Sequence, residues 1–319
     1  MTVEGGVASQ VYEKIQLLPE TERLGYIKGW MANCLDSRIK TELTALLSLM
    51  QLCAPKANTE SAQNCSLQVV ILLHGIRTQA IWHSLVKNEL SKLTGVKVIP
   101  IGYGWFNAFQ FWFPFNILRA EPEKILLREF RDIKEQYKDA NLVVIAHSFS
   151  TYLISRILED HTDIKITKLI LCGSIIPRNY RWDKVRASAT GMAVVNEVGT
   201  KDIWPVMATV TSTGYGCSGA TGFGTNRVTD RYFNYGHSDF FTLEHIKKYW
   251  LPFVSDGTIS QSPWDIDRPS QSFLLNLAGS LPIVSKFIFY GLLCTIFWVL
   301  WNAAPHLATS IYHFFRIFI

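Results

Sequence analysis

Between residues 67 and 250, short apolar runs alternate with amphipathic stretches. Runs such as LQVVILL at 67–73 and LVVIA at 142–146 are continuous, which is typical of strands buried on both faces. The pattern predicts strands at 67–73, 96–101, 142–146, 168–172, 192–198 and 228–235, and helices at 79–93, 119–138, 150–158 and 240–249. Strands alternating with helices indicate an α/β fold in which crossover helices cover a mostly parallel sheet.

The N-terminal part has a different pattern. Apolar residues recur at helical spacing over residues 8–53, and the polar, breaker-rich stretch 54–64 is typical of a linker. We therefore expect a helical appendage with its linker over 1–66, a core over 67–252, and a linker with C-terminal helices over 253–319. Packing on the core is the simplest role for the appendage, with partner binding or dimerisation as alternatives.

The C-terminal tail is strongly apolar. Residues 287–304 read FIFYGLLCTIFWVLWNAA, without a charge and long enough for a transmembrane helix. Its six aromatic residues suit a lipid boundary. Because 273–285 and 306–319 are also apolar-rich, the tail predicts one span with flanking interfacial helices, or a helical hairpin. A buried core helix is the alternative, and otherwise the lipid bilayer is the expected partner.

Composition and charge narrow the class of protein. The net charge of +5 is small for 319 residues and its basic residues are scattered, which argues against nucleic acid as a partner. The six cysteines are widely spaced, which argues against disulfides and structural zinc. The N-terminus lacks the pattern of a secretory signal, so we expect a membrane protein whose catalytic domain is cytoplasmic. Self-association into a homo-oligomer is left open.

The segment Ala146-His147-Ser148-Phe149-Ser150 carries the clearest chemistry. It directly follows the apolar strand and leads straight into a helix, as a nucleophile elbow does. Such a turn requires small residues two before and two after the serine. Alanine and serine stand here where glycine is usual. Ser148 is the predicted nucleophile, and a helix cap is its simpler alternative.

An oxyanion needs backbone N–H donors after the nucleophile and after the first core strand. Phe149 and Ile76 occupy these two positions. Gly75 allows the backbone to come close to a substrate. Arg77 is a candidate for binding a substrate phosphate or carboxylate, or for a structural ion pair.

A nucleophilic serine also needs a histidine base and a carboxylate that orients it. In the elbow type of site the chain order is serine, acid, histidine. Asp202 follows the strand at 192–198 through a turn, and His237 follows the last strand. Asp183 and Glu197 are the rival acids.

The strand, the His74-Gly75 pair after it and the elbow together resemble the α/β-hydrolase superfamily of serine esterases and lipases over residues 67–250. The resemblance starts at the family's third strand. It implies a three-layer α/β sandwich with Ser148, Asp202 and His237 as the triad, and no metal or cofactor. It does not imply a substrate, because this fold serves many chemistries.

Two further stretches bear on the site. Residues 102–116 hold seven Trp and Phe side chains, which could line an acyl pocket, touch a membrane or pack beneath other elements. The glycine-rich stretch 212–225 lacks the ending of a phosphate loop, and we expect a mobile connection there, with gating of the site as an alternative.

The sequence thus favours a membrane-anchored serine hydrolase that cleaves an ester, with a lipid or acyl ester as one candidate. Thioesterase and peptidase chemistry use the same triad. The alternative from another class is a catalytically degenerate hydrolase-like module that acts as a membrane-tethered interaction or effector protein.

Overall fold

A computed structural model describes residues 67–75, 81–102, 119–188, 191–268 and 273–317, together with Lys14, 26–29, Thr44 and Phe111. Its centre is a six-stranded sheet in the order β2-β1-β3-β4-β5-β6, and every neighbouring pair is parallel. The strands are β1 (Gln68–Leu73), β2 (Val96–Ile101), β3 (Asn141–His147), β4 (Lys168–Cys172), β5 (Ala193–Gly199) and β6 (Thr229–Phe233). The predicted parallel α/β fold is confirmed.

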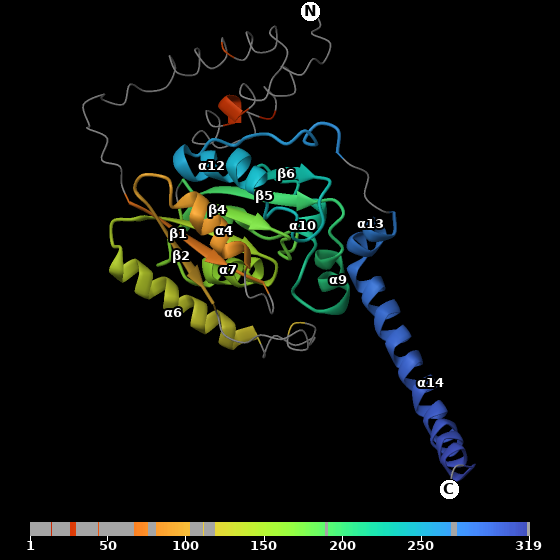
Figure 1. Ribbon diagram of the computed structural model, residues 1–319. Helices are drawn as coiled ribbons and strands as arrows, with labels where there is room; N and C mark the ends of the chain where they lie inside the picture. Colours follow the sequence, from red (N-terminus) through yellow and green to blue (C-terminus); the bar gives the residue numbers. More distant parts are fainter. Residues whose placement is uncertain are drawn as a thin grey trace, which may run out of the picture.

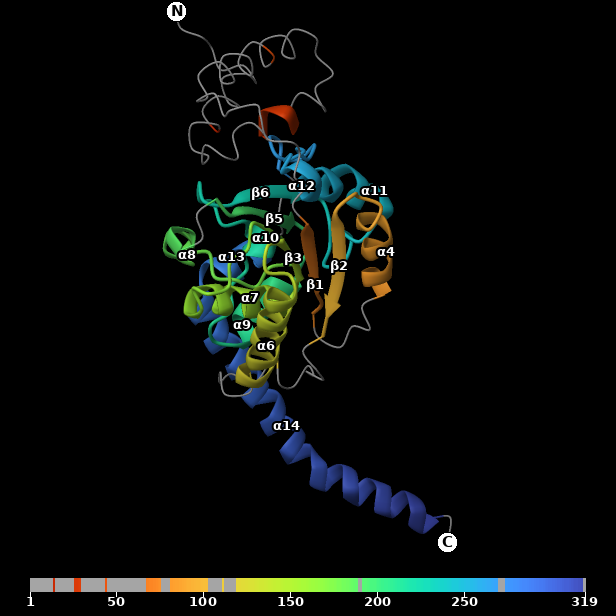
Figure 2. The same cartoon turned by 90° about the vertical axis from the view of Figure 1, so that its left-hand side faces the viewer.

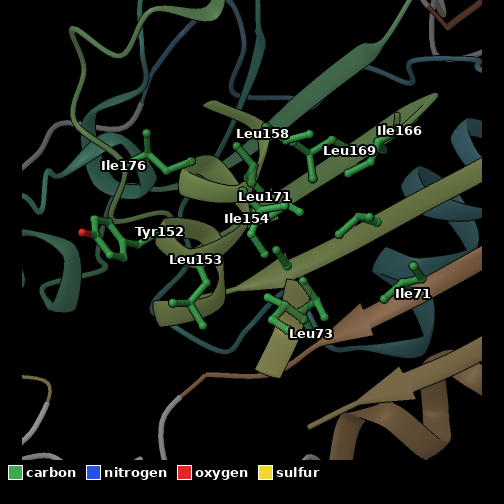
Figure 3. Close-up of a cluster of buried hydrophobic side chains, with 14 of the residues drawn as sticks. Ile71, Leu73, Tyr152, Leu153, Ile154, Leu158, Ile166, Leu169, Leu171 and Ile176 are labelled. Carbon is green, nitrogen blue, oxygen red and sulfur yellow. The ribbon is translucent and has the colours of Figure 1, made fainter. Parts of the chain in front are cut away.

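The strands form because each has an apolar side chain for both faces. In β1, Val69, Ile71 and Leu73 enter one hydrophobic cluster, while Val70 and Leu72 enter a second cluster on the opposite face. This period of two follows from the pleat of a strand. Figure 3 shows side chains of the first cluster, where those of the sheet meet those of the helix after β3.

Helices cover both faces, which makes three layers (Figure 2). On the face of the first cluster lie α6 (Ala120–Gln136), α7 (Phe149–Asp160) and α8 (Trp182–Ser188). On the other face lie α4 (Ile81–Leu90), α11 (Leu243–His245), the π-helical turn Ile246–Trp250 and α12 (Leu251–Asp256). A parallel sheet is buried on both faces in this way because crossover helices must pack on it.

The predicted N-terminal appendage lies almost entirely outside the described residues. Its described part, 26–29, is helical, and Tyr26 and Ile27 are buried in the second cluster. A Cβ at Gly29 would lie 1.9 Å from the carbonyl oxygen of Ile259, so this segment approaches the core closely. This short segment therefore packs on the core, with Lys28 exposed.

The C-terminal tail forms two helices, α13 (Phe273–Ser280) and α14 (Pro282–Ile317). Both views show α14 running away from the sheet as one long helix (Figures 1 and 2). A helical hairpin is therefore not what forms. Residues Pro282–Ala303 are long and apolar enough to cross a membrane, and none of their most apolar window is buried in the protein.

Besides α8 and α12, two more helices occupy segments that the pattern did not predict as helical. These are α9 (Trp204–Thr211) and α10 (Ser218–Thr221). The glycine-rich stretch is mostly buried rather than an open connection. A Cβ at Gly216 would lie 2.3 Å from Pro177 Cα, and one at Gly219 would lie 2.1 Å from the Ser174 nitrogen. Gly216 and Gly219 therefore allow this stretch to pack directly against the backbone of Ser174 and Pro177.

A buried ion pair joins β5 to β6. Glu197 accepts hydrogen bonds from the Arg231 guanidinium and from Trp250 Nε1 (2.8 Å), and His245 Nε2 lies 3.4 Å away. Burial by itself raises the pKa of the Glu197 carboxyl, but the charges of Arg231 and His245 outweigh it and lower this pKa to about 2. The carboxylate is thus ionised and fully partnered inside the sheet.

We predict that Glu197→Gln lowers the free energy of unfolding by about 3–5 kcal/mol, because it leaves the Arg231 charge buried without its partner. The matched control is Glu159→Gln, which removes a half-exposed ion pair to Arg156 and should cost less than about 1 kcal/mol. Denaturant unfolding of the full chain in detergent measures both. Equal losses would contradict the prediction.

The lowered pKa of the Glu197 carboxyl leads to a second prediction, that stability depends on pH. The pKa of this carboxyl in the folded protein lies below the ordinary value of 4.5, so its contribution is complete above about pH 4.5 and is lost as the pH falls towards 2. Unfolding of the wild type between these pH values should therefore show a slope that Glu197→Gln reduces.

Candidate active site

The carboxyl ends of the parallel strands meet at one edge of the sheet. The strand order reverses around β1, whose neighbours are β2 and β3, and ligands of open α/β sheets bind outside such a switch point. The predicted site residues follow strand ends at this edge: Gly75 after β1, Ser148 after β3, Asp202 after β5 and His237 after β6.

Ser148 has an unusual backbone. Its φ is 58° and its ψ is −124°, and it is the only residue other than glycine with a positive φ in the described part of the chain. It stands alone between the last residue of β3 and the first of α7. A left-handed conformation at a non-glycine residue is costly and is often found at functional sites.

The residues flanking the turn explain how it tolerates the two departures from glycine. Ala146 is fully buried in β3 opposite Leu73 of β1. The hydroxyl of Ser150 accepts a hydrogen bond from the His147 N–H (3.0 Å) and lies within donating distance of the Leu73 carbonyl (3.0 Å). Ser150 therefore links the two strands at the turn, which glycine could not do.

The predicted acid and base are in direct contact. His237 Nδ1 and Asp202 Oδ2 are 2.8 Å apart, and Asp202 Oδ1 accepts a hydrogen bond from the backbone N–H of Trp204 at 3.0 Å. Asp202 is 1% exposed, whereas the His237 side chain is 18% exposed. This contact uses Nδ1, so Nε2 is the nitrogen that can exchange a proton with a substrate or nucleophile.

Both rival acids lie elsewhere. Asp183 is exposed in the first turn of α8. Glu197 is held by Arg231 and Trp250.

Gly173, which the sequence reasoning missed, sits between the elements of the site. Its φ is +55°, and a Cβ there would lie 2.7 Å from His237 Cε1 and 3.2 Å from Asp202 Oδ2. The preceding residue, Cys172, accepts a hydrogen bond from the Ser148 N–H at 2.9 Å. The available signal was a glycine directly after a buried strand. Its lack of a side chain lets the imidazole approach the Ser148 turn.

The predicted oxyanion loop reaches the same turn. A Cβ at Gly75 would lie 2.8 Å from Ser148 Cβ and 3.3 Å from its Oγ. Phe149 begins α7, and the N–H groups of a first helical turn point towards that end of the helix. Ile76 and Arg77 lie outside the described residues, so their predicted roles stay predictions.

The described hydrogen bonds link His237 to Asp202 and do not link Ser148 Oγ to His237. Contacts between nucleophile and base are commonly long in unliganded sites and shorten when substrate binds. The roles of the three residues therefore stay a prediction, with the histidine and the acid already paired.

His147 is a second residue whose position the sequence did not reveal. Its side chain is buried, its Nε2 lies 3.0 Å from the carbonyl oxygen of His237, and its ring packs against those of His237 and Phe241. Burial and then the charge of His237 lower the pKa of His147 well below its usual value, so the imidazole is neutral. Because Nε2 faces the His237 carbonyl oxygen, which can only accept, the single ring proton of neutral His147 is on Nε2.

The predicted aromatic stretch 102–116 lies outside the described residues except for Gly102 and Phe111. Phe111 is buried and packs against Phe149 and Tyr215, so this one side chain belongs to the core beside the elbow. Across the described ranges, His, Cys, Asp and Glu side chains form no group of three that could hold a metal ion.

Comparisons with known proteins give no family for the chain. No protein-family model matches it, and no curated protein matches it. Among solved structures, a cutinase-like protein from Cryptococcus sp. matches 60% of this chain and 89% of its own, with 10% identity and a TM-score of 0.32. A likeness at this level assigns neither fold nor activity.

We predict that Gly75→Ala slows the reaction of Ser148 with an active-site probe at least tenfold, because the added methyl group overlaps Ser148 Cβ. Gly102→Ala is the control, since among the described residues its methyl group would meet only the end of the His74 side chain, at 3.4 Å. Equal labelling rates for the two variants would show that Gly75 does not constrain the nucleophile.

A second prediction concerns His147. His147→Phe removes the donor to the His237 carbonyl and should lower kcat on the order of 10-fold or more with little change in KM, because small misplacements of a base are costly. His147→Gln keeps an N–H donor and should recover part of the loss. Steady-state kinetics on a soluble ester separates these outcomes, and equal kcat in both variants would refute a positioning role.

Proposed function

We propose that this protein is a membrane-anchored serine hydrolase of the α/β-hydrolase kind that cleaves a carboxylic ester. The observation that carries the proposal is the left-handed backbone of Ser148 at a strand-to-helix turn, at the same sheet edge as the hydrogen-bonded pair His237 and Asp202. Strained turns of this kind expose a serine hydroxyl at the top of the sheet.

In this mechanism His237 Nε2 accepts the proton of Ser148 Oγ while the oxygen attacks the ester carbonyl carbon. Asp202 keeps the proton of His237 on Nδ1 and stabilises the imidazolium. The backbone N–H groups of Phe149 and Ile76 would bind the oxyanion.

The tetrahedral intermediate then collapses. The alcohol leaves with the proton from His237, and an acyl-serine remains. A water molecule gives a proton to His237 and attacks the acyl carbon. The bond to Ser148 Oγ then breaks, His237 returns the proton to this oxygen, and the carboxylic acid is released.

The anchoring part of the proposal rests on α14. Its Pro282–Ala303 segment has a mean hydropathy of 2.0, and large apolar side chains such as Phe287, Phe297 and Trp301 are more than two-thirds exposed. Exposed apolar area of this extent requires lipid or another apolar partner. We expect the catalytic part on the cytoplasmic side.

A fluorophosphonate probe tests the chemistry on the full chain in detergent. We predict that it labels the wild type at Ser148 and spares Ser148→Ala. Asp202→Asn should slow labelling about 10³–10⁴-fold, because the histidine loses the partner that sets its tautomer. Asp183→Asn is the matched control and should label at the wild-type rate, since Asp183 is exposed on α8.

Two outcomes would count against the proposal. Absence of labelling in folded wild-type protein would favour a hydrolase-like module without turnover. Slow labelling of Asp183→Asn in place of Asp202→Asn would reassign the acid.

A further inference from the structure

The candidate acid and helix α9 form one unit. Asp202 lies two residues before Trp204, the first residue of α9, and its Oδ1 accepts the Trp204 N–H. Because Asp202 also holds His237 through its other oxygen, the start of α9 is fixed with respect to the imidazole. The ring of Trp204 is 6.3 Å from that of His237.

Another side of α9 packs against the apolar tail, which is formed by α13 and α14. Val206 and Val210 are buried in a small apolar cluster to which Leu275 of α13 and Phe289 of α14 contribute. The hydroxyl of Tyr290 donates a hydrogen bond to the Thr211 carbonyl at the end of α9. Figure 1 shows α9 beside the first turns of α14. One short helix thus connects the candidate site to the membrane helix.

The start of α9 is apolar and exposed. Ile203 and Trp204 are 47% and 48% exposed, although they adjoin a buried carboxylate. On the neighbouring helices, apolar side chains are exposed as well: Phe273 and Leu277 on α13, Leu281 between the helices, and Ile283 and Phe287 on α14. Exposed apolar side chains are therefore present both beside the candidate acid and on the two tail helices that pack against α9.

The bilayer surface is the partner that this arrangement fits. The apolar segment of α14, Pro282–Ala303, starts at the first residue of the helix and has the roughly 20 residues that a span requires. The residues of α14 that contact α9, Phe289 and Tyr290, lie in the first half of this segment. The beginning of such a segment lies at the level of the head groups, where tryptophan is favoured.

We propose that Ile203 and Trp204 lie in the head-group region of the bilayer. The site then accepts acyl esters that are dissolved in the same membrane that contains α14. The substrate class is then a lipid-like ester that enters the site from the bilayer rather than from water. This inference rests on the proposed hydrolase function for its substrate, but not for its membrane contact.

The membrane contact can be tested without catalysis. The full chain is reconstituted into phosphatidylcholine vesicles in which bromine is placed near the head groups of the lipid. Trp204→Phe should remove a quenched component from the tryptophan fluorescence of the wild type. Trp264→Phe, which removes a 37% exposed tryptophan from the segment after α12, should remove an unquenched one. Equal quenching of both components would overturn the contact.

The substrate class is tested in the same vesicles with two esters, a long-chain fluorogenic ester dissolved in the bilayer and a water-soluble acetate ester. The double variant Ile203→Ser/Trp204→Ser should lower the ratio of the bilayer rate to the soluble rate at least tenfold. Ile266→Ser removes a 55% exposed apolar side chain from the segment after α12 and should leave the ratio unchanged.

Each failure has a distinct signature. An unchanged ratio in the double variant, with both esters still cleaved, would overturn the inference and leave the hydrolase function intact. Loss of both rates in equal proportion would also overturn it, because the pair would then support Asp202 rather than membrane contact. Lack of any ester cleavage or probe labelling in the wild type would refute the hydrolase function, while the quenching result would still decide the contact.

Discussion

The turn at Ser148 is the constraint around which the other parts of the site are arranged. Its left-handed backbone costs on the order of 1–3 kcal/mol, so neighbouring elements must hold it. The Ser148 N–H is bonded to the end of β4, and the Ser150 hydroxyl connects the turn to the end of β1. The strand on each side of β3 therefore stabilises the strained residue, and the parallel sheet is what brings both strand ends to it.

Close approach to this turn requires that side chains be absent at two places. Gly75 lies against Ser148, and Gly173 lies against His237 and Asp202, at distances where a Cβ would overlap them. A methyl group at either glycine would displace the group beside it. The geometry of the site thus depends on the space that these glycines leave as much as on the three side chains that we propose carry its chemistry.

Helix α9 contacts two features that lie far apart in the sequence, the candidate acid and the apolar tail. One end binds Asp202 through the Trp204 N–H, and the side facing α13 and α14 packs against the apolar tail. Because packed interiors deform little, a displacement of the tail would move α9, and with it Asp202. The depth of the tail in a bilayer would therefore set the height of the site above it, which relates anchoring to the choice of substrate.

Local pattern by itself determined the α/β fold, the positions of the six strands and the long apolar tail, because burial on both faces leaves continuous apolar runs in the sequence. It also singled out Ser148, Asp202 and His237 from their places after strands. It could not choose between Asp202 and Asp183, which both follow strands, nor reveal the contacts of His147. Those depend on which turns fold back against residues 35 to 90 positions away, and only tertiary packing decides that.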